Sequence, residues 1–234
     1  LLKHSISSIL KNCPIPFEIS VCGPKKILNN IFFKKNNITF IPEKKNISSR
    51  ANINSKKNLI IKRASMDNLI LCHDHISFDK YFFERLIDYG NYFDFYDLDK
   101  RDLITGNLSI SSRVSFIYPI TSFSYKPLIK SFQSSDSPNL FMNGSLYIGK
   151  TALFKKILLD EHLYWDELED LHFSEKIRLH GFVINHDSQN YALTSSLRHG
   201  KLNFKYFFFR FIKKIISILY LIIIYIKFRK TIIN

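Results

Sequence analysis

Helix-like and strand-like runs of apolar residues alternate along the first 75 residues of the chain. Apolar residues recur every three or four positions over 2–10, the spacing of a helix, and at alternate positions over 17–21, the spacing of a strand. Pro14 and Pro16 separate the two runs, because proline ends a helix. We expect further helices over 25–33 and 52–64, and further strands over 38–41 and 69–72. The apolar run over 69–72 is short enough for a buried parallel strand. Strands that alternate with helices favour an α/β sheet.

The rest of the chain continues this alternation less regularly. Ser77 can cap the first helix of this part, Gly181 ends the last one, and the polar stretch 97–138 is left unassigned. We expect helices over 77–89, 151–159 and 166–180, and strands over 92–96 and 182–184.

The length of 234 residues favours one domain with an appendage over two independent domains. Hydrophobic residues make up 46% of the chain and Gly and Pro number only 7 each, so most of it is expected to be globular. Three cysteines without Cys-x-x-Cys spacing favour neither a disulfide framework nor a zinc site, and they fit a reducing compartment. The chain starts at Leu1 and shows no secretory signal, and we expect its natural N-terminus to be missing.

The formal net charge of +14 is unevenly distributed. Residues 1–65 carry 13 Lys and Arg against 2 Asp and Glu, residues 66–198 carry 13 against 18, and residues 199–234 carry 8 against none. This pattern indicates an anionic ligand for the first part, carboxylate chemistry in the second and an anionic surface for the third. The simpler explanation is a composition rich in Ile, Asn and Lys, which makes the whole chain basic.

Two polar clusters carry candidate chemistry. Residues 165–170 read Trp-Asp-Glu-Leu-Glu-Asp and place four acids at the expected start of a helix, where the helix dipole favours negative charge. His73, Asp74 and His75 follow the strand expected over 69–72, at the kind of sheet edge where α/β proteins bind ligands. Taken alone, an ordinary acidic first turn and a polar strand end also explain these clusters.

Taken together and in order, these motifs resemble the family 2 glycosyltransferases, which use nucleotide sugars and have the GT-A fold. The resemblance covers most of residues 5–186. Its most specific part is 165–170, which matches the Trp-x-x-x-Glu-Asp motif that opens the catalytic helix, followed at the usual spacing by Ser174, Arg178 and Gly181. Further matches are 16–23 to the second strand and the turn under the base, 56–65 to the helix near the nucleotide, 71–76 to the strand ending in the Asp-x-Asp region, and 143–150 to the acceptor-side segment.

The resemblance implies an α/β fold of the GT-A (Rossmann-like) type over residues 1–200, a mixed sheet flanked by helices. Two departures from the family are visible: its first strand is absent from this sequence, and the Asp-x-Asp region reads His-Asp-His. The implied activity is that of a hexosyltransferase-type glycosyltransferase in polysaccharide biosynthesis.

The resemblance also implies roles for individual residues. Asp170 is the catalytic base, and Glu169 orients the acceptor or the helix start and raises the proton affinity of Asp170 by its like charge. The cofactor is a divalent cation, Mn²⁺ or Mg²⁺, and imidazole ligands shift the preference away from Mg²⁺. The donor-binding residues are Cys22, Gly23, Lys57, Asn58 and Asp74. The acceptor-binding residues are Asn143, Gly144 and Trp165. The metal ligands are Asp74, His75 and His199, with His186 as the alternative to His199.

Residues 201–234 are expected to form a separate apolar and basic helix. Between Lys214 and Lys227 lie 12 uncharged residues, which as a helix reach roughly 18 Å, short of the ~30 Å hydrocarbon core of a bilayer. An amphipathic helix lying on anionic lipid is our first expectation, and a membrane span, a dimer-forming helix and a core helix are the alternatives. This places the protein in the cytoplasm, peripheral on the inner face of the cell membrane.

The predicted function is transfer of a sugar from a nucleotide-diphosphate donor to a glycan or lipid-linked acceptor, in a single displacement that inverts the anomeric carbon. The alternatives are a catalytically weakened relative and a non-enzymatic basic module that binds membranes or nucleic acid. No aromatic and basic residues are interleaved as in RNA-binding motifs, so no nucleic-acid partner is expected.

Overall fold

The computed structural model describes residues 1–25, 31–43, 52–108, 142–163 and 169–195. Its helices are α1 (Leu2–Asn12), α2 (Ile31–Lys35), α3 (Ile53–Arg63), α4 (Phe82–Tyr89), α5 (Thr151–Lys156) and α6 (Glu169–Leu179). Its strands are β1 (Ser20–Gly23), β2 (Thr39–Pro42), β3 (Asn68–Cys72), β4 (Ile76–Ser77), β5 (Phe95–Asp102), β6 (Leu146–Lys150) and β7 (Ile184–Thr194).

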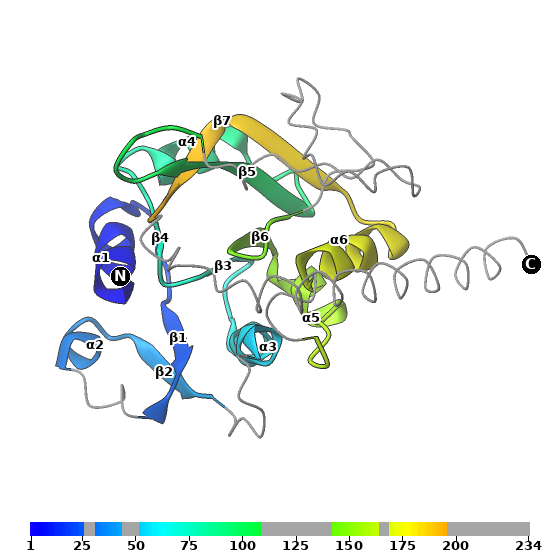
Figure 1. Ribbon diagram of the computed structural model, residues 1–234, viewed down its shortest axis with the longest axis horizontal. Coiled ribbons are helices and arrows are strands. Elements are labelled where there is room, and N and C mark those ends of the chain that lie inside the picture. Colours follow the sequence, from blue (N-terminus) through cyan, green and yellow to red (C-terminus); the bar gives the residue numbers. More distant parts are fainter. Residues whose placement is uncertain (26–30, 44–51, 109–141, 164–168, 196–234) are drawn as a thin grey trace, which may run out of the picture.

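The strands form two sheets with helices around them (Figure 1). β1 and β2 pair in parallel, and the larger sheet has the order β3-β6-β5-β7-β4. In that sheet β5 and β7 run parallel, whereas the β3–β6, β5–β6 and β4–β7 pairs are antiparallel. The α/β sheet predicted from the alternating periodicities is therefore confirmed, as is the mixed sheet flanked by helices that the resemblance implies.

Each face of the larger sheet packs against its own set of helices, because alternate strand residues point to opposite faces. Phe95 in β5 and Tyr147 in β6 belong to one cluster, and their neighbours Tyr96 and Ile148 belong to the other. The first cluster includes Ile61 of α3, Phe154 of α5, and Phe173 and Ile177 of α6. The second includes Phe82 and Phe83 of α4, with Ile9 of α1 against its edge.

Three of the details that differ from the sequence-based expectations concern β3, Ser77 and β5. The strand over 69–72 was expected to be parallel and is antiparallel, because its partner among the described residues is the returning strand β6. Ser77 does not cap a helix: it pairs with Leu193 in the short strand β4, and α4 begins at Phe82. The polar stretch after residue 97 was left unassigned, yet β5 continues to Asp102 because β7 pairs with it along that length.

The expected helix over 201–234 lies outside the described residues. Among the helices that the structure does describe, none is long and apolar enough to cross a bilayer.

Gly149 sets how closely β6 approaches the aromatic residues of the first cluster. It lies opposite Phe95, and a Cβ atom at this position would come within 2.6 Å of the Phe95 ring and 3.0 Å of the carbonyl oxygen of Asp94. Contacts this short require the strands or the ring to move, and Phe95 has no exposed surface toward which to move.

We therefore predict that Gly149→Ala lowers the free energy of unfolding by ~1–3 kcal/mol, the usual cost of overpacking a core. Denaturant unfolding followed by circular dichroism measures this difference. An unchanged midpoint would mean that β5 and β6 separate at little cost, in contradiction to the packing described here.

Candidate active site

The acid pair Glu169 and Asp170 begins α6 and packs against Gly144. The Gly144 N–H donates to Asp170 Oδ2 at 3.3 Å, and the Leu171 N–H donates to Asp170 Oδ1 at 3.0 Å. A Cβ atom on Gly144 would lie 3.1 Å from Glu169 Oε1 and 3.4 Å from Asp170 Cβ. The structure thus brings together the proposed base and one of the residues assigned to the acceptor, and a side chain at position 144 would push them apart.

The turn at Asn143–Ser145 is fixed at both ends by hydrogen bonds. Asn143 Oδ1 accepts from the Ser145 N–H at 3.0 Å and from the Ser145 hydroxyl at 2.7 Å. The Ser174 hydroxyl donates to the Asp170 carbonyl oxygen at 2.8 Å and accepts from the Met142 N–H at 3.0 Å. Ser174 therefore ties the turn to α6, which gives this residue of the matched motif a structural role.

Lys57, assigned to the donor from sequence, is buried under this turn. Its ammonium group donates to the Gly144 carbonyl oxygen at 2.6 Å and lies 4.2 Å from the centroid of the Tyr147 ring. Burial lowers the Lys57 pKa to about 8, against the opposing effect of the Glu169 and Asp170 charges. Lys57 thus supplies positive charge beside the acid pair from inside the protein, and its contact with a donor stays a prediction.

Lys100 is a second buried lysine at this site, and the sequence analysis missed it. Its ammonium group donates to the Ser145 hydroxyl at 2.9 Å, and burial lowers its pKa to about 8 although the charges of Asp97 and Asp170 oppose the shift. It belongs to β5, whose second half lacks strand periodicity. The one available signal was a lysine among acids directly after an aromatic strand.

His73, Asp74 and His75 form the turn between β3 and β4. The His73 carbonyl oxygen accepts from the Ile76 N–H at 3.1 Å, and the rings of His73 and His75 lie on the same side with their centroids 5.5 Å apart. His75 Nδ1 is buried, has no hydrogen-bond partner in the described part of the chain and lies 3.7 Å from Asp74 Oδ1. The His73 N–H donates to the Ser145 carbonyl oxygen at 3.0 Å, which joins this turn to the turn that holds the acid pair.

His186, the alternative third metal ligand, is paired with acids of β5. His186 Nδ1 lies 3.0 Å from Asp97 Oδ2, and His186 Nε2 lies 3.9 Å from Asp99 Oδ1. Burial raises the Asp97 pKa, and the hydrogen bond from His186 opposes that rise. Sequence reasoning did not find Asp97 or Asp99, because it left their strand unassigned.

The remaining donor residues lie around the ends of β1 and α3. Cys22 and Gly23 end β1, where burial raises the pKa of the half-buried Cys22 thiol. The Asn58 side chain forms two hydrogen bonds with the backbone of Leu159. Its amide nitrogen donates to the Leu159 carbonyl oxygen at 2.8 Å, and its amide oxygen accepts from the Leu159 N–H at 3.0 Å. Trp165 and His199 lie outside the described residues, so their acceptor and metal assignments stay predictions.

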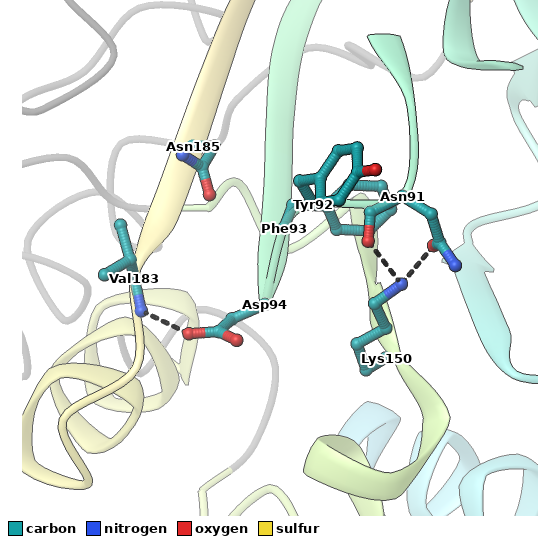
Figure 2. Close-up of a pocket in the computed structure, with 7 residues that line it drawn as sticks. All are labelled: Asn91, Tyr92, Phe93, Asp94, Lys150, Val183 and Asn185. Atoms are coloured by element: carbon teal, nitrogen blue, oxygen red, sulfur yellow. Dashed lines mark hydrogen bonds between the residues drawn. The ribbon is translucent and has the colours of Figure 1, made fainter.

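A separate open hollow of about 450 Å³ lies at the other end of β6, away from the acid pair. Figure 2 shows Lys150 reaching toward the carbonyl and amide oxygens of Asn91 there, and the Val183 N–H donating to Asp94 Oδ2 at 3.1 Å. In this hollow Lys150 and Asp94 already form hydrogen bonds with other groups of the protein. We therefore assign the candidate active site to the acid pair.

No protein-family model matches the chain, and no curated protein matches its sequence. Its structure is similar to that of S. aureus TarS 1-349 in complex with UDP-GlcNAc, with a TM-score of 0.56 and 16% identity over 86% of this chain and 56% of that one. It is also similar to the mannosyltransferase PcManGT from Pyrobaculum calidifontis in complex with GDP-Man and Mn²⁺, with a TM-score of 0.56 and 10% identity over 85% and 54% of the two chains. The chain therefore shares the fold of these two proteins, and it spans little more than half the length of either.

The buried charge of Lys100 predicts a pH-dependent stability. The Lys100 pKa falls from 10.5 to about 8 on folding, so between these values the unfolded chain binds more protons than the folded one. The contribution of Lys100 to the free energy of unfolding therefore rises with pH in this window, by up to about 1.4 kcal/mol per pH unit. We expect the wild type to gain stability over Lys100→Met between pH 8 and 10.5 in urea unfolding experiments.

The matched control for this prediction is Lys62→Met, on the exposed face of α3. The difference between wild type and this control is expected to stay constant over the same pH range. A constant difference for Lys100→Met as well would show that Lys100 is not buried as a charged group.

Proposed function

We propose that this protein transfers a glycosyl group from a nucleotide sugar to an acceptor hydroxyl, with Asp170 as the general base. The observation that supports this most directly is the contact of Asp170 with Gly144 over two buried lysines, beside the turn that carries His73, Asp74 and His75. A carboxylate at this position can take the proton of an acceptor hydroxyl.

In this mechanism Asp170 accepts the proton of the acceptor hydroxyl as its oxygen attacks the anomeric carbon. The bond from that carbon to the nucleoside diphosphate breaks in the same displacement, so the anomeric configuration inverts. Glu169, which is buried beside Gly144, orients the start of the helix. Lys57 and Lys100 hold the turn and keep the surroundings of the carboxylates positive.

The donor is proposed to be a nucleoside-diphosphate sugar bound near the ends of β1 and α3 and the turn after β3. Two structures of the same fold contain UDP-GlcNAc and GDP-Man. Near Cys22 in this protein, Lys56 pairs with Glu43, which places a cation beside the end of β1. The basic first 65 residues are consistent with an anionic ligand.

The turn after β3 offers some, but not all, of the ligand atoms that a divalent cation needs. Asp74 Oδ1 and the unbonded Nδ1 of His75 are two potential donor atoms 3.7 Å apart, and a bound diphosphate and water would complete the coordination. Among the residues that the structure describes, no group of three His, Cys, Asp or Glu side chains is placed to hold a metal ion. When bound, the cation would offset charge on the diphosphate leaving group.

For the acceptor we propose a glycan or a lipid-linked sugar, reached at the inner face of the cell membrane. This proposal is supported by the composition of residues 199–234, which carry 8 basic residues, no acidic ones and a long apolar run. Each basic residue near an anionic leaflet adds ~1 kcal/mol of attraction.

The first test replaces the base. Asp170→Asn is expected to lower the transfer rate by roughly 10²–10⁴ because general-base catalysis is lost, while donor affinity stays within a few fold. A panel of nucleotide sugars is incubated with the protein, and released nucleoside diphosphate is measured.

Asp88→Asn on the exposed face of α4 makes the same chemical change away from the site, and it is expected to keep full activity. Near-normal turnover of Asp170→Asn would refute its role as base. Donor binding without turnover in the wild type would favour a weakened relative, and neither binding nor turnover would favour a non-enzymatic module.

The second test concerns the cation. Asp74→Ala is expected to weaken UDP binding measured by calorimetry in the presence of Mn²⁺, because the cation loses its carboxylate ligand. In the variant, adding a chelator should then leave the UDP affinity unchanged. Equal UDP affinity of the wild type with and without Mn²⁺ would contradict the proposed metal site.

A further inference from the structure

The hydroxyl group of Tyr147 is a buried donor without a hydrogen-bond partner among the described residues. Tyr147 is completely buried, and its ring is fixed between the Lys57 ammonium group at 4.2 Å and the Phe173 ring at 5.2 Å. A buried hydroxyl without a partner destabilises the folded protein, because it has given up its hydrogen bonds to water. Such a group in a folded protein calls for an explanation, and one recognised explanation is a functional role.

The Tyr147 hydroxyl lies at the acid pair. It is 3.5 Å from the point where a Cβ atom on Gly144 would stand, and the Cβ of Asp170 is 3.4 Å from the same point. Burial raises the Tyr147 pKa well above its ordinary value, and the charges of Asp170 and Glu169 add to this rise. The phenol therefore keeps its proton at every physiological pH and remains a donor.

The present contacts of Asp170 leave room for this donor. The hydrogen bond from the Gly144 N–H is long, at 3.3 Å, and is therefore weak. A phenol O–H that donates to a carboxylate forms a shorter and stronger hydrogen bond than this contact.

We propose that the Tyr147 hydroxyl donates a hydrogen bond to the Asp170 carboxylate and is a positioning residue of the transfer site. This inference rests on the proposed function for its catalytic consequence, but the contact itself is independent of it. The other charged groups that face Asp170 are Lys57 from α3 and Lys100 from β5, with Glu169 and His172 on its own helix. None of these is changed when Tyr147 is replaced by phenylalanine.

The test is the carboxyl titration of Asp170 in wild type and Tyr147→Phe, followed by ¹³C NMR and assigned with Asp170→Asn. A donor that favours the ionised form lowers a carboxyl pKa, so its removal is expected to raise the Asp170 midpoint by about 1 pH unit. The acid limb of the pH profile of kcat/KM should likewise move to higher pH in Tyr147→Phe. Its kcat should be about tenfold lower than that of the wild type.

Tyr96→Phe is the matched control. It removes the hydroxyl of another buried tyrosine, one that donates to Asp187 at 2.5 Å on the other side of the sheet. This variant is expected to lose stability and to leave the Asp170 titration and turnover unchanged.

An Asp170 midpoint that is the same in Tyr147→Phe and wild type would overturn the inference, whatever the activity. A shifted midpoint in a protein that turns over no nucleotide sugar would confirm the hydrogen bond and refute the proposed function. The two failures are therefore distinguishable.

Discussion

Lys57 places a positive charge inside the protein at the point where three separate segments meet. Its ammonium group binds the carbonyl oxygen of Gly144, covers the ring of Tyr147 and faces the carboxylates of Glu169 and Asp170. Two adjacent carboxylates at a largely buried helix start repel each other and lose hydration, at a cost of several kcal/mol unless a cation is close. The approach of α6 to the turn before β6 depends on this lysine.

The larger sheet extends this arrangement along β5. Phe95 and Tyr96 pair with β6, whereas the residues after them pair only with β7 among the described strands. Lys100 then reaches the turn before β6, and Asp97 pairs with His186 from β7. The same sheet therefore carries an apolar core at one end and a buried polar layer at the other, and the polar layer lies next to the proposed base.

The parts of the site that could be predicted are those encoded within a few residues of one another. The acid pair begins α6, and the exit glycine Gly181 follows the end of that helix with the positive φ of 76° that such an exit requires. Lys100 could not be found in this way. Its strand has polar residues on both faces because both are buried by other elements, so the period-2 pattern that marks a half-exposed strand is missing.

The sequence by itself determined the class of fold, through alternating helix and strand periods, and the local acid motif, through spacing on one helix. Only the tertiary structure decided which charges meet. Lys57 lies 87 residues from its acceptor in Gly144, and Lys100 lies 45 residues from Ser145. Contacts at such separations depend on strand order and register, which arise from how the two faces of the sheet bury their side chains together, and no local pattern encodes that packing.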